Sequence, residues 1–266
     1  MNNLENKFKS LKQTSKKALI AYLTAGYPSE GETVKLAALF ERSGADILEI
    51  GVPFSDPVAD GKTVQFASYQ ALQKGMSLSR VFGIVRKIRK RSAIPVVLMG
   101  YLNPFMRRGL RHSLELAKSS GVDGLIIPDI IPEEGAEIKK MCGKLGLSLI
   151  FLAAPNTPEE RLAAIDSASG GFVYVVSVAG VTGARKQLPS STRAYLIKTG
   201  KRITKNPRIL GFGISGPEQV KKLKDYVDGV IVASALIDII RNGKGRKIPY
   251  SKLSLFLKSL RHALDA

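Results

Sequence analysis

One carboxylate of this 266-residue chain, Glu49, lies inside an apolar run, DILEIG at 46–51, that has the composition of a buried strand. An ionised carboxylate is strongly destabilised in a low-dielectric interior unless it is paired. Because side chains alternate along a strand, Leu48 and Ile50 would share one face and Glu49 would lie on the other. We therefore expect Glu49 either to be held in an internal ion pair or to carry out acid–base chemistry.

The other apolar runs of the sequence offer Glu49 no obvious cation. Apart from Arg208, at the very start of one run, these segments contain neither lysine nor arginine. Burial without a cationic partner raises the pKa of a carboxyl group toward neutrality, where the group can both donate and accept a proton. This pattern favours a catalytic role for Glu49.

A second carboxylate, Asp60, follows eleven residues after Glu49, at the end of the loop VPFSDPVADG. A loop that folds back over the end of the strand would bring Asp60 to the same substrate. The alternative is a turn or helix cap, because Asp before Pro or Gly commonly forms turns. For Asp56, which precedes Pro57, we favour that alternative.

The elements that must position these acids follow a βα pattern. Short apolar runs alternate with longer amphipathic segments, many of which end in glycine, as expected of helices in a parallel α/β protein. Eight such units in one domain over 1–266 predict an α/β fold of the TIM (β/α)8 type, with the active site at the carboxyl ends of the strands. Segments 3–11 and 251–265 are expected to form extra terminal helices, the first covering the barrel bottom. The predicted strands are 18–23, 46–51, 94–100, 123–129, 147–153, 172–177, 208–213 and 229–234.

Glycine-rich or small-residue turns follow the last three predicted strands: GVTGA, GFGIS and VASAL. Turns of this kind present backbone N–H groups and helix N-termini to an anion, and barrel enzymes bind phosphate there. A tight βα turn can also use glycine for purely structural reasons. Three such turns together favour a phosphorylated small molecule as the substrate.

Composition excludes several other classes of function. Only two histidines and one cysteine, Cys142, are present, so no metal site is expected, and the lack of a strand lysine disfavours a Schiff-base aldolase. The net charge of +19 would attract polyanions, but basic residues are scattered without aromatic interleaving, so no nucleic-acid partner is expected. No apolar stretch is long enough to span a membrane and no signal core precedes the lysines, so the expected location is the cytoplasm.

The segment LEIGVPFSDPVADG resembles the signature of the tryptophan synthase alpha chain family, with both carboxylates in register. Other segments of the chain resemble further segments of that family, in the same order and over nearly the whole chain: AYLTAGYPS, LMGYLNP, DGLIIPD, SVAGVTGAR and GFGIS. The resemblance implies cleavage of indole-3-glycerol phosphate to indole and glyceraldehyde 3-phosphate. It also implies no cofactor in this chain, and a beta chain that carries pyridoxal phosphate, receives the indole and forms an α2β2 assembly.

The same resemblance implies roles for individual residues. Glu49 would be the general acid–base and Asp60 would accept a hydrogen bond from the indole N–H. Substrate contacts would come from aromatic, lid and phosphate-site positions: Tyr22, Tyr101, Tyr174, Thr182, Gly183, Gly213 and Ser234. The beta chain would face Pro53, Phe54, Asp56 and Pro57.

Two positions depart from the family pattern. Ala233 stands where the family usually has glycine, and its methyl group would crowd the phosphate if the backbone there required a positive φ. Val178 stands in the lid where arginine is frequent. These departures keep open a subunit that mainly activates its beta chain, and an unrelated phosphate-binding barrel enzyme is the remaining alternative.

Overall fold

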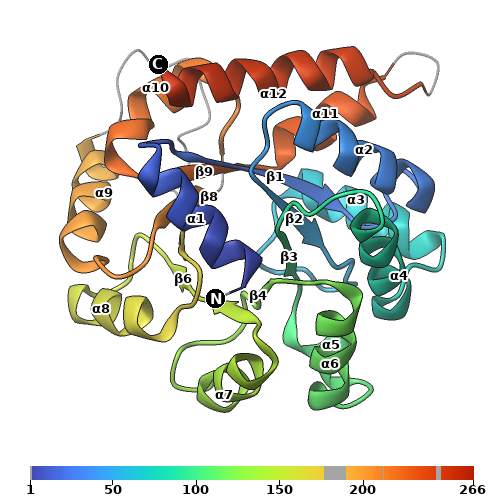
Figure 1. Ribbon diagram of the computed structural model, residues 1–266, viewed down its shortest axis with the longest axis horizontal. Helices are drawn as coiled ribbons and strands as arrows, with labels where there is room; N and C mark the ends of the chain where they lie inside the picture. Colours follow the sequence, from blue (N-terminus) through green and yellow to red (C-terminus); the bar gives the residue numbers. More distant parts are fainter. Residues whose placement is uncertain (1, 177–189, 212, 244–246) are drawn as a thin grey trace.

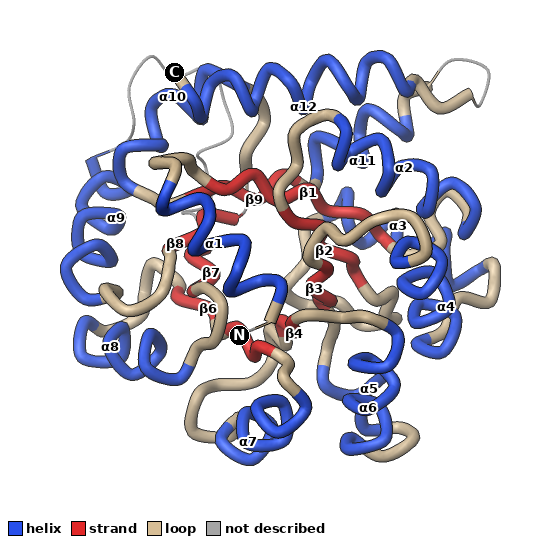
Figure 2. Tube along the Cα trace, viewed as in Figure 1, coloured by secondary structure: helices blue, strands red, loops and turns tan. Residues whose placement is uncertain are grey.

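The computed structural model describes residues 2–176, 190–211, 213–243 and 247–266. Parallel strands form a ring at its centre and helices surround the ring (Figure 2). This arrangement is the predicted (β/α)8 barrel. Within the described residues no helix is long and apolar enough to cross a membrane.

The strands pair in the order β5-β4-β3-β2-β1-β9-β8-β7-β6, and every pairing is parallel. The run predicted as one strand at 147–153 forms two short segments, β5 and β6, separated by Phe151. β5 pairs with β4 and β6 with β7, while the Tyr174 N–H donates to the Phe151 carbonyl across the break at 3.1 Å. The break therefore lies within one barrel strand. The bounds are β1 Ala18–Thr24, β2 Ile47–Gly51, β3 Val96–Met99, β4 Gly124–Ile126, β5 Ser148–Ile150, β6 Leu152–Ala153, β7 Val173–Val176, β8 Arg208–Gly211 and β9 Gly229–Val232.

Helices follow the strands and form the outer layer (Figure 1). Most strands are shorter than predicted, at one or both ends. The helices are α1 Asn3–Gln13, α2 Glu30–Arg42, α3 Lys62–Gln73, α4 Leu78–Arg89, α5 Leu102–Met106, α6 Leu110–Ser120, α7 Ala136–Leu145, α8 Glu159–Ala168, α9 Ser190–Arg202, α10 Pro217–Leu223, α11 Ser234–Arg241 and α12 Tyr250–Asp265, with a 3-10 turn η1 at Lys224–Tyr226.

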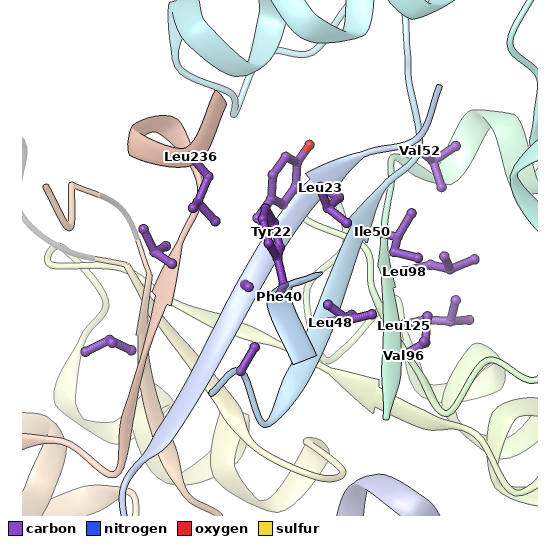
Figure 3. Close-up of a cluster of buried hydrophobic side chains, with 14 of the residues drawn as sticks. Tyr22, Leu23, Phe40, Leu48, Ile50, Val52, Val96, Leu98, Leu125 and Leu236 are labelled. Atoms are coloured by element: carbon purple, nitrogen blue, oxygen red, sulfur yellow. The ribbon is translucent and has the colours of Figure 1, made fainter. Parts of the chain in front are cut away.

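Alternation along each strand separates two apolar cores. Leu48 and Ile50 belong to the outer core between sheet and helices, where Ile50 lies beside Leu98, its register partner on β3 (Figure 3). Ile47, on the opposite face of β2, belongs to the inner core of the barrel. The predicted orientation of this strand is confirmed, and Glu49 shares the inward face.

Helix α1 closes the amino-terminal end of the barrel, as predicted. Leu4, Phe8 and Leu11 are buried in the inner core, and the Phe8 ring lies 5.7 Å from that of Phe172. Asn2 caps the helix and also donates to the Ser148 hydroxyl at 2.8 Å. The carboxyl end is therefore the end left for a site, and the loop that carries Asp60, whose charge acts on Glu49, lies there.

Three aspartates directly precede strands at this closed end, and each accepts an N–H from the first or second residue of a neighbouring strand. Asp46 bonds Leu19 N at 2.9 Å, Asp123 bonds Val96 N at 2.9 Å and Asp228 bonds Arg208 N at 2.8 Å. Each carboxylate also pairs with an arginine: Arg261, Arg89 and Arg208 respectively. These acids fix the relative positions of the strands.

Candidate active site

Glu49 occupies the middle of β2, paired in register with Tyr22 of β1 and Val97 of β3. The residue is buried, with only 1% of its surface exposed to solvent. Within the described part of the chain its Oε2 atom has no hydrogen-bond partner and no cation pairs with it. Burial, reinforced by the nearby charge of Asp60, raises the pKa of Glu49 from 4.5 to about 8. The ion pair that was one of the two alternatives expected for Glu49 is therefore not formed by the described residues.

Two inward-facing tyrosines enclose Glu49, and glycines on neighbouring strands provide their space. A Cβ atom at Gly51 would lie 1.9 Å from the Tyr22 hydroxyl oxygen, and one at Gly211 would lie 2.2 Å from that of Tyr174. Both tyrosines are buried, and burial raises the pKa of each phenol well above 10. Neither glycine was predicted to belong to the site, although the sequence places both on the inward face at the end of a strand, which is a pattern that could have indicated it.

Asp60 lies on the loop that leads into α3, but it does not cap that helix. The N-cap of α3 is Gly61, which has no side chain to bond the helix. The Asp60 backbone forms a turn, because its N–H donates to the Pro57 carbonyl at 3.0 Å. Among the described residues its carboxylate has no hydrogen-bond or ion-pair partner, and burial raises its pKa from 3.8 to about 6.

Tyr101, at the start of α5, holds this loop over the barrel. Its hydroxyl accepts the Ala59 N–H at 2.8 Å, and its ring stacks on Phe54 with centroids 5.1 Å apart. Both contacts are to the segment that joins Glu49 to Asp60. The carboxylate of Asp129 in turn accepts the Leu102 N–H of α5 at 3.0 Å, a supporting contact that the sequence analysis did not identify.

Comparison with known proteins decides the family. The sequence profile of the tryptophan synthase alpha chain family matches residues 8–264. The alpha chain from Thermoanaerobacter sp. (strain X514) is 43% identical over 99% of this chain and 100% of its own, and that from Pyrococcus abyssi (strain GE5 / Orsay) is 50% identical over 84% of this chain and 90% of its own. The chain belongs to the tryptophan synthase alpha chain family.

Solved structures agree with this assignment. The alpha subunit from Legionella pneumophila str. Paris has a TM-score of 0.91 at 37% identity, covering 100% of this chain and 99% of its own. A chain of the aminoacrylate-bound form of tryptophan synthase from M. tuberculosis has a TM-score of 0.87 at 31% identity, covering 99% of this chain and 100% of its own. Membership confirms the predicted lyase of tryptophan biosynthesis and the prediction that this chain uses no cofactor of its own.

The predicted phosphate-site residues of this family member are partly described. Gly213 has φ +84°, a left-handed conformation that favours glycine, and Ser234 is the first residue of α11. Ala233 has φ −125°, so the backbone there does not require glycine and the condition for crowding by a positive φ is not met. Thr182, Gly183 and Val178 lie outside the described residues.

The loop expected to face the beta chain is only partly exposed. Pro53 is buried and Phe54 and Pro57 are half-buried, whereas Asp56 is exposed, with its carboxylate accepting the Ser55 hydroxyl. Pro53 and Phe54 also line a cavity of about 800 Å³ outside the barrel, with Arg107 and Arg108 at its wall. In the described part of the chain, no three His, Cys, Asp or Glu residues gather as a metal site would require.

Proposed function

We propose that Glu49 and Asp60 together cleave indole-3-glycerol phosphate in this chain by a retro-aldol reaction. The observation that carries this proposal is a fully buried, unpaired glutamate at the open end of the barrel, with a second carboxylate on the loop that follows it. Enzymes assign acid and base roles to paired carboxyl groups by giving them different pKa values.

The pKa values suit different roles for the two acids. With a pKa of about 8, Glu49 is mostly protonated near pH 7 and can donate its proton to indole C3. The resulting carboxylate then accepts the proton of the glycerol hydroxyl next to the breaking C–C bond, which becomes the aldehyde carbonyl. The bond electrons return to the indole ring, and Glu49 ends the cycle protonated.

Asp60, with a pKa of about 6, is mostly ionised near pH 7. It can therefore accept a hydrogen bond from the indole N–H and stabilise the positive charge that forms when C3 is protonated. Tyr22, Tyr101 and Tyr174 would line the indole site, and the turn at Gly213 with Ser234 would hold the phosphate. Thr182 and Gly183 belong to the same proposal as lid residues.

The proposal extends to a partner. The loop at 53–57 would contact a beta chain that carries pyridoxal phosphate, in an α2β2 assembly located in the cytoplasm. Exposed Asp56 and the 86% exposed Val58 support contact at the tip of this loop. Contact there would act on both acids, because the loop joins them.

The experiment is to measure indole release from indole-3-glycerol phosphate, with and without a beta chain, for wild type and Asp60→Asn. We expect turnover by wild type and a severe loss in the variant, because the substituted amide supplies no charge. Circular dichroism checks that the variant is folded. A folded variant with wild-type turnover would remove Asp60 from the mechanism, and wild-type turnover near zero in both conditions would favour the activating subunit.

A further inference from the structure

A second cavity, of about 590 Å³, opens at the closed end of the barrel. It lies between the carboxyl end of α1 and the segments that lead into β1, β8 and β9. Six of its fourteen lining residues are basic: Lys9, Lys12, Lys16, Lys17, Lys205 and Arg208. Lysine and arginine together make up only 41 of the 266 residues of the chain, so positive charge is concentrated here.

Most of this charge has no partner in the part of the chain that the structure describes. The one acid of the lining, Asp228, pairs with Arg208 at 3.4 Å, and Lys17 donates to the Val227 carbonyl at 2.7 Å. Over the described residues, the side chains of the other four lysines form neither an ion pair nor a hydrogen bond. Four ammonium groups around one cavity repel each other, and a bound anion would relieve that repulsion.

The shape and the lining favour one class of anion. A volume of this size is within the range of small-molecule sites. Several ammonium groups, each with three donors, suit a ligand whose negative oxygens are spread over linked phosphates. Among the described lining residues the only aromatic one, Phe8, is 9% exposed and packs on Phe172, so none of them offers a free ring to stack a base.

We propose that this cavity binds a small molecule with two or more linked phosphate groups, recognised through the phosphates alone. The site lies at the amino ends of the strands, opposite the Gly213 and Ser234 turns at their carboxyl ends. The proposal is therefore independent of the proposed reaction.

Titration calorimetry with inorganic triphosphate tests this proposal, at constant ionic strength and with excess glycerol 3-phosphate to occupy the other phosphate site. The cavity variant is Lys12→Gln/Lys16→Gln/Lys205→Gln. The control is Lys90→Gln/Lys140→Gln/Lys252→Gln, which removes the same charge from exposed lysines that also lack partners among the described residues. We expect one site in wild type and control, and binding weakened by about tenfold or more in the cavity variant, because charge-assisted hydrogen bonds are lost.

A nucleoside triphosphate provides the second arm. Binding as tight as that of inorganic triphosphate, and equally sensitive to the cavity variant, would support recognition through the phosphates alone. Equal affinities of the cavity variant and the control for triphosphate would overturn the proposal, because the lysines would then attract counter-ions only. Nucleotide binding that persists in the cavity variant would contradict it as well. Because all six substituted lysines are exposed, we expect both variants to fold.

Discussion

At the amino end of the barrel, Asp46 and Asp123 each accept a strand N–H and pair with an arginine, whereas Glu49 near the carboxyl end has neither partner within the described residues. All three acids lie on or directly before strands, and all three are largely shielded from water. They differ in whether an arginine and a backbone N–H stabilise the carboxylate. The paired acids hold the ends of strands together, whereas the raised pKa of the unpaired acid lets it keep a proton near pH 7, as the proposed reaction requires.

Buried acidic residues in such a barrel differ in role according to whether a cation and a hydrogen-bond donor neutralise them. A buried carboxylate that is compensated by an arginine and a backbone donor stabilises the fold, because loss of either partner leaves a buried charge. A buried carboxylate without compensation destabilises the fold in its ionised form, so its presence calls for a functional reason. Burial alone does not separate the two classes.

The largest effect that we expect from breaking this contrast is at Glu49. Glu49→Gln keeps the size of the side chain but removes its proton transfer, which commonly accounts for roughly 10²–10⁴ in rate. Steady-state assays of indole release would measure the loss in kcat. The matched control is Glu115→Gln at an exposed position of α6, which should leave kcat unchanged. A loss of only a few-fold at Glu49 would exclude it as the acid–base group.

At the opposite end, Asp123→Asn should unfold the protein more easily without changing its chemistry. The substitution leaves the half-buried Arg89 without its carboxylate, and because loss of one partner of a buried pair typically costs about 3–5 kcal/mol, we expect a destabilisation of up to that size. Urea unfolding monitored by circular dichroism would measure this difference, with Asp225→Asn at the surface as the control. If kcat per folded molecule falls as strongly as in Glu49→Gln, the separation of roles between the two ends is wrong.

The pH dependence of stability gives a third, smaller effect. Between its ordinary pKa of 4.5 and its native pKa of about 8, Glu49 keeps a proton that the unfolded chain has lost, so its contribution to stability falls as pH rises. Glu49→Gln lacks this contribution. We therefore expect the variant to become more stable relative to wild type from about pH 5 to about pH 8, by roughly a few kcal/mol at most. Urea midpoints across this range would measure it, and a constant difference would contradict the raised pKa.

The smallest effect that we expect comes from filling the space that Gly211 leaves for the ring of Tyr174, one of the two tyrosines that enclose Glu49. Gly211→Ala forces the buried Tyr174 ring to shift, which should cost about 1–3 kcal/mol in stability and reduce turnover through a displaced wall of the site. Gly143→Ala in α7 is the matched control, since its added methyl meets no atom within 4 Å and should be neutral or stabilising. Thermal unfolding and indole release would compare the two. Equal behaviour of both variants would show that Tyr174 does not depend on this glycine.

Much of the fold and part of the site could be predicted because they depend on local patterns. Alternation in DILEIG gave the inward direction of Glu49, and eight βα units gave the barrel. The break at Phe151 could not be predicted, because an uninterrupted apolar run does not reveal where a strand leaves its neighbours. The support of Tyr101 by Asp129, and the space that Gly51 and Gly211 leave for tyrosines, depend on contacts between different strands and loops.

The sequence by itself determined the period of the elements, the face of each side chain and the absence of lysine from the strand interiors, because these follow from spacing and residue type. Only the tertiary structure decided which acids are compensated. Asp46 pairs with Arg261, which lies 215 residues away in the sequence. Glu49 is instead enclosed by tyrosines from other strands and pairs with no cation among the described residues. Whether a buried carboxylate is paired depends on which distant side chains the fold brings within a few ångströms of it. The local sequence around the carboxylate does not determine that distance.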